Sequence, residues 1–178
     1  MTGDLQNSIS EFPETNSNTI LIGLGNEYRR DDGAGLIIVR KLKSILPPHI
    51  VTFEVKDKPT ILMEIWNNFD RVIVFDAVYS GNKPGTIYQF NPVSKSLPTQ
   101  FVHSSTHSMS LIEVIELSRA LCQLPLSMMV YGIEGKSYEM GYGLSKEVTN
   151  AVEEIVEKVT RQFLDDSSCK SVSLTSSS

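Results

Sequence analysis

The sequence predicts an α/β protein, a three-layer sandwich in which helices cover both faces of a mostly parallel sheet of about five strands. Short apolar segments, typical of buried strands, alternate along the chain with segments whose apolar residues recur at helical spacing. Glycine-containing loops follow the first, third and last of the buried strands. Because ligands of such sheets bind outside the carboxyl ends of the strands, these loops are expected to meet in space.

The expected strands are short, and their patterns differ. The run at 72–75 is continuously apolar, which is typical of a strand buried on both faces, and 127–131 is expected to be another buried strand. The segment 86–90 alternates between apolar and polar residues and suits an edge strand. The full set of expected strands is 20–24, 50–55, 72–75, 86–90 and 127–131.

The helices are predicted from apolar residues at helical spacing and from residues that favour helix ends. Pro47 ends the first helix. Thr106 and Ser108 are the expected caps of the third helix, and Ser145 is the expected cap of the last. The four expected helices span 33–46, 59–67, 108–121 and 145–163.

The length of 178 residues suits a single domain with a core of its own. We expect that domain at 18–164, between a disordered polar extension at 1–17 and a disordered serine-rich tail at 165–178. The first residues lack the basic start and apolar core of a signal peptide, and no run reaches 18 apolar residues. Neither secretion nor a membrane span is expected.

Charge and cysteine content exclude further classes. The formal net charge of −5 argues against a general nucleic-acid binder, which usually carries a basic face. Cys122 and Cys169 are too few for a disulfide framework and are expected to be free thiols in a reducing cytoplasm. Cys122 falls in an apolar helical pattern, a poor position for a nucleophile.

The most informative stretch lies between the first strand and the first helix and reads TILIGLGNEYRRDDGAG. A glycine turn at Gly23 and Gly25 leads into a charged loop that ends in two adjacent acids, Asp31 and Asp32. The loop lacks the third glycine or the lysine that a bound phosphate would require. It therefore indicates a cation or acid–base chemistry rather than a nucleotide.

Two further candidates fall at the same edge of the expected sheet. Asp76 ends the third strand, and His107 directly precedes the helix at 108–121. Together with Asp32 they form a plausible site for a divalent transition metal, because two carboxylates and an imidazole leave coordination positions open. Glu134, in the loop after the last strand, either supports a ligand by hydrogen bonding or is an ordinary loop acid.

Each of these residues also has a structural interpretation. Asp32 could be a helix cap, Asp76 a turn residue and His107 a surface or capping histidine. Asp31 is expected to be an exposed cap or a salt-bridge partner. His103 is the competing histidine.

In order and spacing, four segments between about Ile20 and Val159 resemble the signature blocks of the hydrogenase maturation proteases. The segments are GLGNEYRRDDGAG, VFDAVYSG, STHSMSLIEVIEL and YGIEG…MGYGLSKEV. The resemblance implies a twisted α/β sandwich of the phosphorylase/hydrolase-like type. It also implies an endopeptidase that removes a C-terminal extension from the large-subunit precursor of a nickel–iron hydrogenase after nickel insertion.

The same resemblance implies how the precursor is recognised. Its nickel would be bound by two acids and a histidine, at the positions of Asp32, Asp76 and His107, so that the substrate supplies the metal. Asp32 stands where some family members have glutamate. We expect a monomer, because no apolar face stays uncovered in this arrangement.

Two mechanisms remain open at this point. The bridging metal could polarise the scissile carbonyl or a water molecule. Alternatively, Asp32 or Asp76 could act as a general base on water, as in aspartic peptidases.

Three other functions are weighed against the protease. Peptidyl-tRNA hydrolases share a turn similar to GLGNEYRR, but they have a histidine–asparagine pair in place of Asp31 and Asp32 and need a basic face for tRNA. A nickel-binding assembly chaperone would use the same ligands without cutting. A dinucleotide-binding protein is the weakest alternative, because Tyr28 stands where the third glycine of that motif belongs.

Overall fold

The computed structural model of the chain describes residues 19–56, 58–94 and 110–171. Five strands form one sheet in the order β2-β1-β3-β5-β4. The pairs β1–β2, β1–β3 and β3–β5 are parallel, and β4 is an antiparallel edge strand. The strands are β1 (Thr19–Leu24), β2 (Val51–Val55), β3 (Arg71–Val78), β4 (Ile87–Phe90) and β5 (Ser127–Glu134). The predicted mostly parallel sheet is confirmed, and the segment expected to be an edge strand is one; its antiparallel direction is a finding of the structure.

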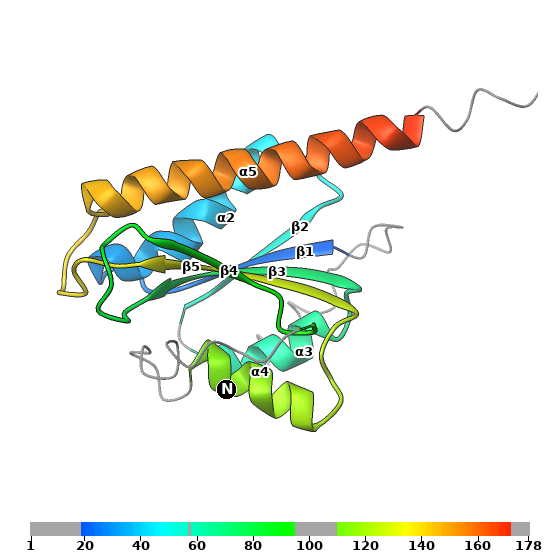
Figure 1. Cartoon of the computed structure of the whole chain (residues 1–178), viewed down its shortest axis with the longest axis horizontal. Helices are drawn as coiled ribbons and strands as arrows, with labels where there is room; N and C mark the ends of the chain where they lie inside the picture. Colours follow the sequence, from blue (N-terminus) through cyan, green and yellow to red (C-terminus); the bar gives the residue numbers. More distant parts are fainter. Residues whose placement is uncertain (1–18, 57, 95–109, 172–178) are drawn as a thin grey trace, which may run out of the picture.

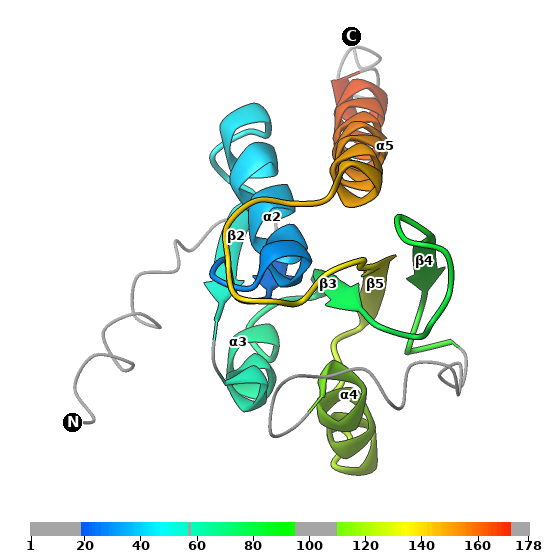
Figure 2. The ribbon, with the colours of Figure 1, turned by 90° about the vertical axis from the view of Figure 1, so that its left-hand side faces the viewer.

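Helices cover both faces of this sheet (Figures 1 and 2). On one face lie α2 (Ala34–Ile45) and α5 (Lys146–Ser171), and on the other lie α3 (Leu62–Trp66) and α4 (Leu111–Ala120). Short 3₁₀ helices precede α2 and α3: η1 (Arg30–Gly33) and η2 (Pro59–Ile61). None of the helices in the described ranges is both long and apolar enough to cross a membrane.

The apolar core has two halves, one on each side of the sheet. Ile73 and Phe75 of β3 belong to the half under α2 and α5. Val72 and Val74 belong to the half over α3 and α4. Burial on both faces explains why β3 is an unbroken apolar run, since successive side chains of a strand point to opposite faces.

Several elements are longer than the sequence predicts. β3 continues to Val78 because it stays paired with β5 up to Val78 opposite Glu134. Asp76 therefore lies within the strand, opposite Gly132, rather than at its end. α5 continues to Ser171, past the predicted helix end and into the predicted tail, whose residues 172–178 lie outside the described ranges.

Cys122 does not lie inside a helix. It follows α4, is exposed and has a left-handed φ of 55°, the conformation in which many helices terminate. The apolar pattern around it continues past the helix end and gave no signal of the stop.

The cap of α4 is Ser110, not the predicted Thr106 or Ser108, which lie outside the described residues. The Ser110 hydroxyl accepts from the N–H of Glu113 at 3.2 Å, and the Glu113 carboxylate accepts from the N–H of Ser110 at 2.6 Å. This reciprocal arrangement satisfies two N–H groups that the helix cannot pair itself.

Replacing Ser110 with alanine is expected to destabilise the protein by about 1 kcal/mol, because the N–H of Glu113 loses its acceptor. Urea denaturation followed by circular dichroism would measure the change. Ser110→Thr, which keeps a hydroxyl, is the matched control and should stay near wild type. Equal losses in both variants would contradict a capping role.

Two glycines bring the start of α2 against the sheet. A Cβ atom on Gly35 would lie 2.3 Å from the carbonyl oxygens of both Leu24 and Phe75. A Cβ atom on Gly23 would lie 2.3 Å from the carbonyl oxygen of Gly35. The helix start is therefore in direct backbone contact with β1 and β3, which places the loop before it beside the carboxyl half of β3.

Candidate active site

The turn after β1 holds Asp32 in place through its backbone. Gly25 has a left-handed φ of 139°, and a Cβ atom there would lie 1.8 Å from the carbonyl oxygen of Asp32. That oxygen accepts from the N–H of Asn26 at 3.3 Å, and the N–H of Asp32 donates to Arg29 at 3.1 Å. Position 25 therefore requires glycine. The Asp32 residue that this turn holds is almost fully buried, at 5% exposure.

Asp76 lies close enough to Asp32 for the two charges to oppose each other. Burial, followed by the charge of Asp32, raises the pKa of the Asp76 carboxyl from 3.8 to about 8, although the N–H of Ala77 partly opposes the shift. The side chain is only partly exposed to solvent. At neutral pH the Asp76 carboxyl holds its proton, and a cation placed between the two acids would favour its release.

The prediction made for Asp31 from the sequence is wrong. Asp31 is fully buried, not an exposed cap or a salt-bridge partner. One carboxylate oxygen accepts from the N–H groups of Lys136 and Ser137 at 2.8 and 3.0 Å, and the other accepts from the N–H of Ser145 at 2.6 Å. Asp31 thus binds the loop 135–145, which connects β5 to α5.

Further hydrogen bonds join loop 135–145 to the loop between β1 and α2. The N–H of Arg30 donates to Gly141 at 2.9 Å, and the N–H of Gly141 donates to Tyr28 at 2.8 Å. The guanidinium of Arg29 donates to the carbonyl oxygen of Tyr138 at 3.2 Å. As a result, loop 135–145 runs across the carboxyl edge of the sheet, from β5 to the start of α2 (Figure 2).

The sequence predicted that the Ser145 side chain would cap α5, and this prediction is wrong. The Ser145 hydroxyl finds no hydrogen-bond partner among the described residues. Instead its N–H donates to Asp31 and its carbonyl oxygen accepts from Thr149 at 2.8 Å. The start of α5 is therefore fixed by the buried aspartate of another loop.

Loop 135–145 places Tyr138 beside the acid pair. Its hydroxyl donates to the carbonyl oxygen of Val78 at 2.7 Å. Burial raises the pKa of Tyr138, and the charges of Asp76 and Asp32 raise it further. Sequence reasoning missed this residue. The available signal was an aromatic residue in the glycine-rich loop after the last core strand.

Glu134 anchors the loop that follows Asp76. This buried acid is the last residue of β5. Its carboxylate accepts from the N–H groups of Ser80 and Gly81 at 2.8 and 2.9 Å, and from the Ser80 hydroxyl at 2.7 Å. Glu134 is therefore not an ordinary loop acid, but its carboxylate binds Ser80 and Gly81 rather than either predicted acid ligand.

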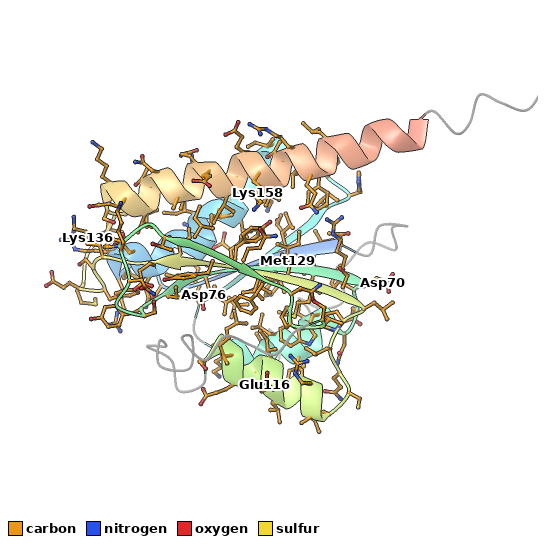
Figure 3. All side chains as sticks on the ribbon, viewed as in Figure 1. Asp70, Asp76, Glu116, Met129, Lys136 and Lys158 are labelled. Atoms are coloured by element: carbon orange, nitrogen blue, oxygen red, sulfur yellow. The ribbon has the colours of Figure 1, made fainter. Side chains whose placement is uncertain are left out.

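The structure thus brings together Asp32 and Asp76 but does not test the third predicted ligand. His107 and the competing His103 both lie outside the described residues. Within the described part of the chain no group of three or more histidine, cysteine or acidic side chains could hold a metal ion. Figure 3 places Asp76 toward the same end of the sheet as Lys136 of loop 135–145, with Asp70 at the opposite end.

Two acids at this edge can do two kinds of chemistry. They can contribute ligands to a divalent cation held by another molecule, or one of them can accept a proton from an attacking water. The raised pKa of Asp76 suits the proton-accepting role, because its proton affinity lies near neutrality, whereas a bound cation has to displace that proton.

Comparison with known proteins gives a consistent family. The chain matches the family model for hydrogenase maturation proteases over residues 38–162, a range that contains Asp76 and begins after Asp32. It is 29% identical over 147 residues to the hydrogenase 2 maturation protease of Escherichia coli strain K12, covering 79% of this chain and 87% of that protein. It is 27% identical over 145 residues to a putative hydrogenase maturation protease of Methanocaldococcus jannaschii, covering 78% and 91%.

Solved structures agree in fold. The hydrogenase maturating endopeptidase HybD from Escherichia coli superposes with a TM-score of 0.65 at 23% identity, covering 83% of this chain and 93% of that one. The HybD maturation protease from Thermococcus kodakarensis gives 0.61 at 27% identity, covering 81% and 97%. The chain belongs to the hydrogenase maturation protease family and is a hydrolase of the peptidase class.

Proposed function

We propose that this protein removes the C-terminal extension from the nickel-loaded large-subunit precursor of a nickel–iron hydrogenase. The observation that carries the proposal is the close approach of Asp32 and Asp76 at the carboxyl edge of the sheet, in a chain of this family. Related proteins are named as proteases of hydrogenase maturation. Nickel is then part of the substrate, and Asp32, Asp76 and His107 are its proposed ligands on the protease.

The proposed sequence of events begins with the precursor's nickel. When the metal approaches, its charge favours loss of the proton from Asp76, so that both acids can bind it. Binding through the metal aligns the scissile peptide bond with the site. An acid that does not remain on the metal, or the metal itself, then activates water for attack.

The test is incubation of the purified protein with the large-subunit precursor, with and without nickel, followed by intact mass measurement. We expect loss of a C-terminal peptide only from the nickel-loaded form, because the acids and the imidazole need the metal as a bridge. His107→Ala should prevent this loss, and His103→Ala is the matched control that should process normally.

Other outcomes would point elsewhere. Complex formation without any change of mass would favour a nickel-binding chaperone. Equal cleavage of both precursor forms would remove nickel from the recognition step. Normal processing by His107→Ala together with loss in His103→Ala would mean that the wrong histidine had been chosen.

A further inference from the structure

Exposed aromatic and methionine side chains gather on the loops around the acid pair. Tyr28, Tyr79, Met140 and Tyr142 are between 51% and 77% exposed. Among the described residues, these three tyrosines are the exposed ones. Tyr28 lies in the loop after β1, Tyr79 directly after β3, and the other two in loop 135–145. We call these four residues the aromatic rim.

The three tyrosine side chains of the rim are each held by a ring contact. The rings of Tyr28 and Tyr142 meet edge to face with centroids 5.3 Å apart. The backbones beneath them are joined by the hydrogen bond from Gly141 to Tyr28 at 2.8 Å. Tyr79 meets the ring of Tyr138 edge to face at 5.9 Å. Ordered aromatic side chains lose little conformational entropy when a partner covers them.

The rim flanks the acids from two sides. Tyr28 and Tyr142 are attached to the helical turn that carries Asp32, through the hydrogen bond from Arg30 to Gly141. On the other side, Tyr79 lies three residues after Asp76 and packs on Tyr138. A folded protein that brings a metal to the two acids must therefore cover these loops.

We propose that the aromatic rim is the docking surface for the folded body of the metal-loaded precursor. The inference rests on the proposed function and adds a surface that recognises protein rather than metal. Tyrosine and methionine are enriched at protein interfaces, and a few aromatic side chains commonly dominate binding. A precursor that docks on the aromatic rim would present an apolar surface around its metal-binding segment. The acids recognise the metal, and the rim recognises the protein that holds it.

The experiment measures docking and cleavage separately in the full-length protein. Tyr142→Ala, Met140→Ala and the double variant are compared with wild type. Isothermal titration calorimetry with the nickel-loaded precursor gives Kd when wild type and variants all carry Asp76→Asn in addition, so that the precursor is not cleaved during the titration. Without that substitution, initial rates over a range of precursor concentration give kcat and KM. We expect the double variant to raise Kd and KM about tenfold or more with a much smaller change in kcat. The reason is that the rim would bind the precursor equally well before and during the chemical step.

Leu126→Ala is the matched control. Leu126 is 82% exposed, and the N–H of the next residue, Ser127, donates to Asp70 at 2.9 Å. Asp70 lies at the end of the sheet opposite Asp76 (Figure 3). Removing an equally exposed apolar side chain there should leave Kd and KM within about twofold of wild type.

The outcomes keep the two proposals apart. Unchanged Kd in the double variant would overturn the docking surface even if the wild type cleaves. Rim-dependent binding without cleavage by the wild type would keep the docking surface and overturn the protease proposal. A wild-type dimer in sedimentation velocity that the double variant converts to monomer would assign the rim to self-association instead.

Discussion

Asp76→Asn should abolish cleavage of the nickel-loaded precursor and, at the same time, make the metal-free protein harder to unfold at neutral pH. The amide cannot supply a negative charge to the metal or accept a proton from water, so we expect a loss of activity on the order of a thousandfold. Intact mass measured over time gives the rate. The exposed Asp70 at the opposite end of β3 is the control, and Asp70→Asn should process normally.

The stability effect follows from the direction of the pKa shift. Burial and the charge of Asp32 raise the Asp76 pKa from 3.8 to about 8, so between these values the folded state holds a proton that the unfolded state has released. The free energy of unfolding of the wild type therefore falls as pH rises through this window. The asparagine variant lacks this contribution and should be more stable above pH 7, by an amount on the order of 2 kcal/mol after allowing for partial solvent screening.

Urea denaturation of both proteins at several pH values between 4 and 9 would measure this difference. The gap between variant and wild type should be small near pH 4 and grow toward pH 8. A constant gap would contradict the raised pKa. Normal processing by Asp76→Asn would remove Asp76 from the site altogether.

Asp31→Ala should destabilise the protein by about 3–5 kcal/mol, more than the removal of either Asp32 or Asp76. The substitution leaves three backbone N–H groups of loop 135–145 without their acceptor, and each unsatisfied buried donor costs about 1–3 kcal/mol. Asp31→Asn retains one acceptor oxygen and should lose less. Urea denaturation gives the ordering, and amide hydrogen exchange at Lys136, Ser137 and Ser145 reports the loop directly.

This prediction changes how activity data on the acid pair should be interpreted. From the sequence alone, an activity loss in Asp31→Asn would suggest that Asp31 rather than Asp32 is the functional acid. The structure predicts such a loss for a different reason, because Asp31 holds the loop that carries Tyr138. Asp32→Asn is the informative comparison, since it should lose activity with little loss of stability. A stable but inactive Asp31→Asn variant would contradict this distinction.

The sequence predicted the architecture and the meeting of Asp32 with Asp76 for one physical reason. Apolar runs such as the one in β3 identify buried parallel strands, and parallel strands bring the residues at their carboxyl ends to one edge. The two aspartates are 44 residues apart and still approach each other, although Asp76 lies two residues before the end of β3 rather than at its end, as the sequence had predicted. Predicting that they lie close together required only that their strands be parallel members of one sheet, and no knowledge of side-chain packing.

The role of Asp31 could not be predicted in this way. Its partners are backbone N–H groups of a loop more than 100 residues later, and any residue type supplies a backbone N–H. Adjacent acids in a sequence also do not reveal which one points inward. Tyr138 was missed for a related reason, because its position over the acids depends on the path of loop 135–145 rather than on a pattern of its own.

The attachment of loop 135–145 to Asp31 also determines when the site can form during protein synthesis. The three donors lie 105, 106 and 114 positions after Asp31. β5, which pairs with β3 beside Asp76, is likewise made late. Contacts between distant segments form only after both have left the ribosome. A nascent chain therefore carries Asp31 long before the loop that it binds has been made, and the candidate site is complete only when nearly the whole domain has been made.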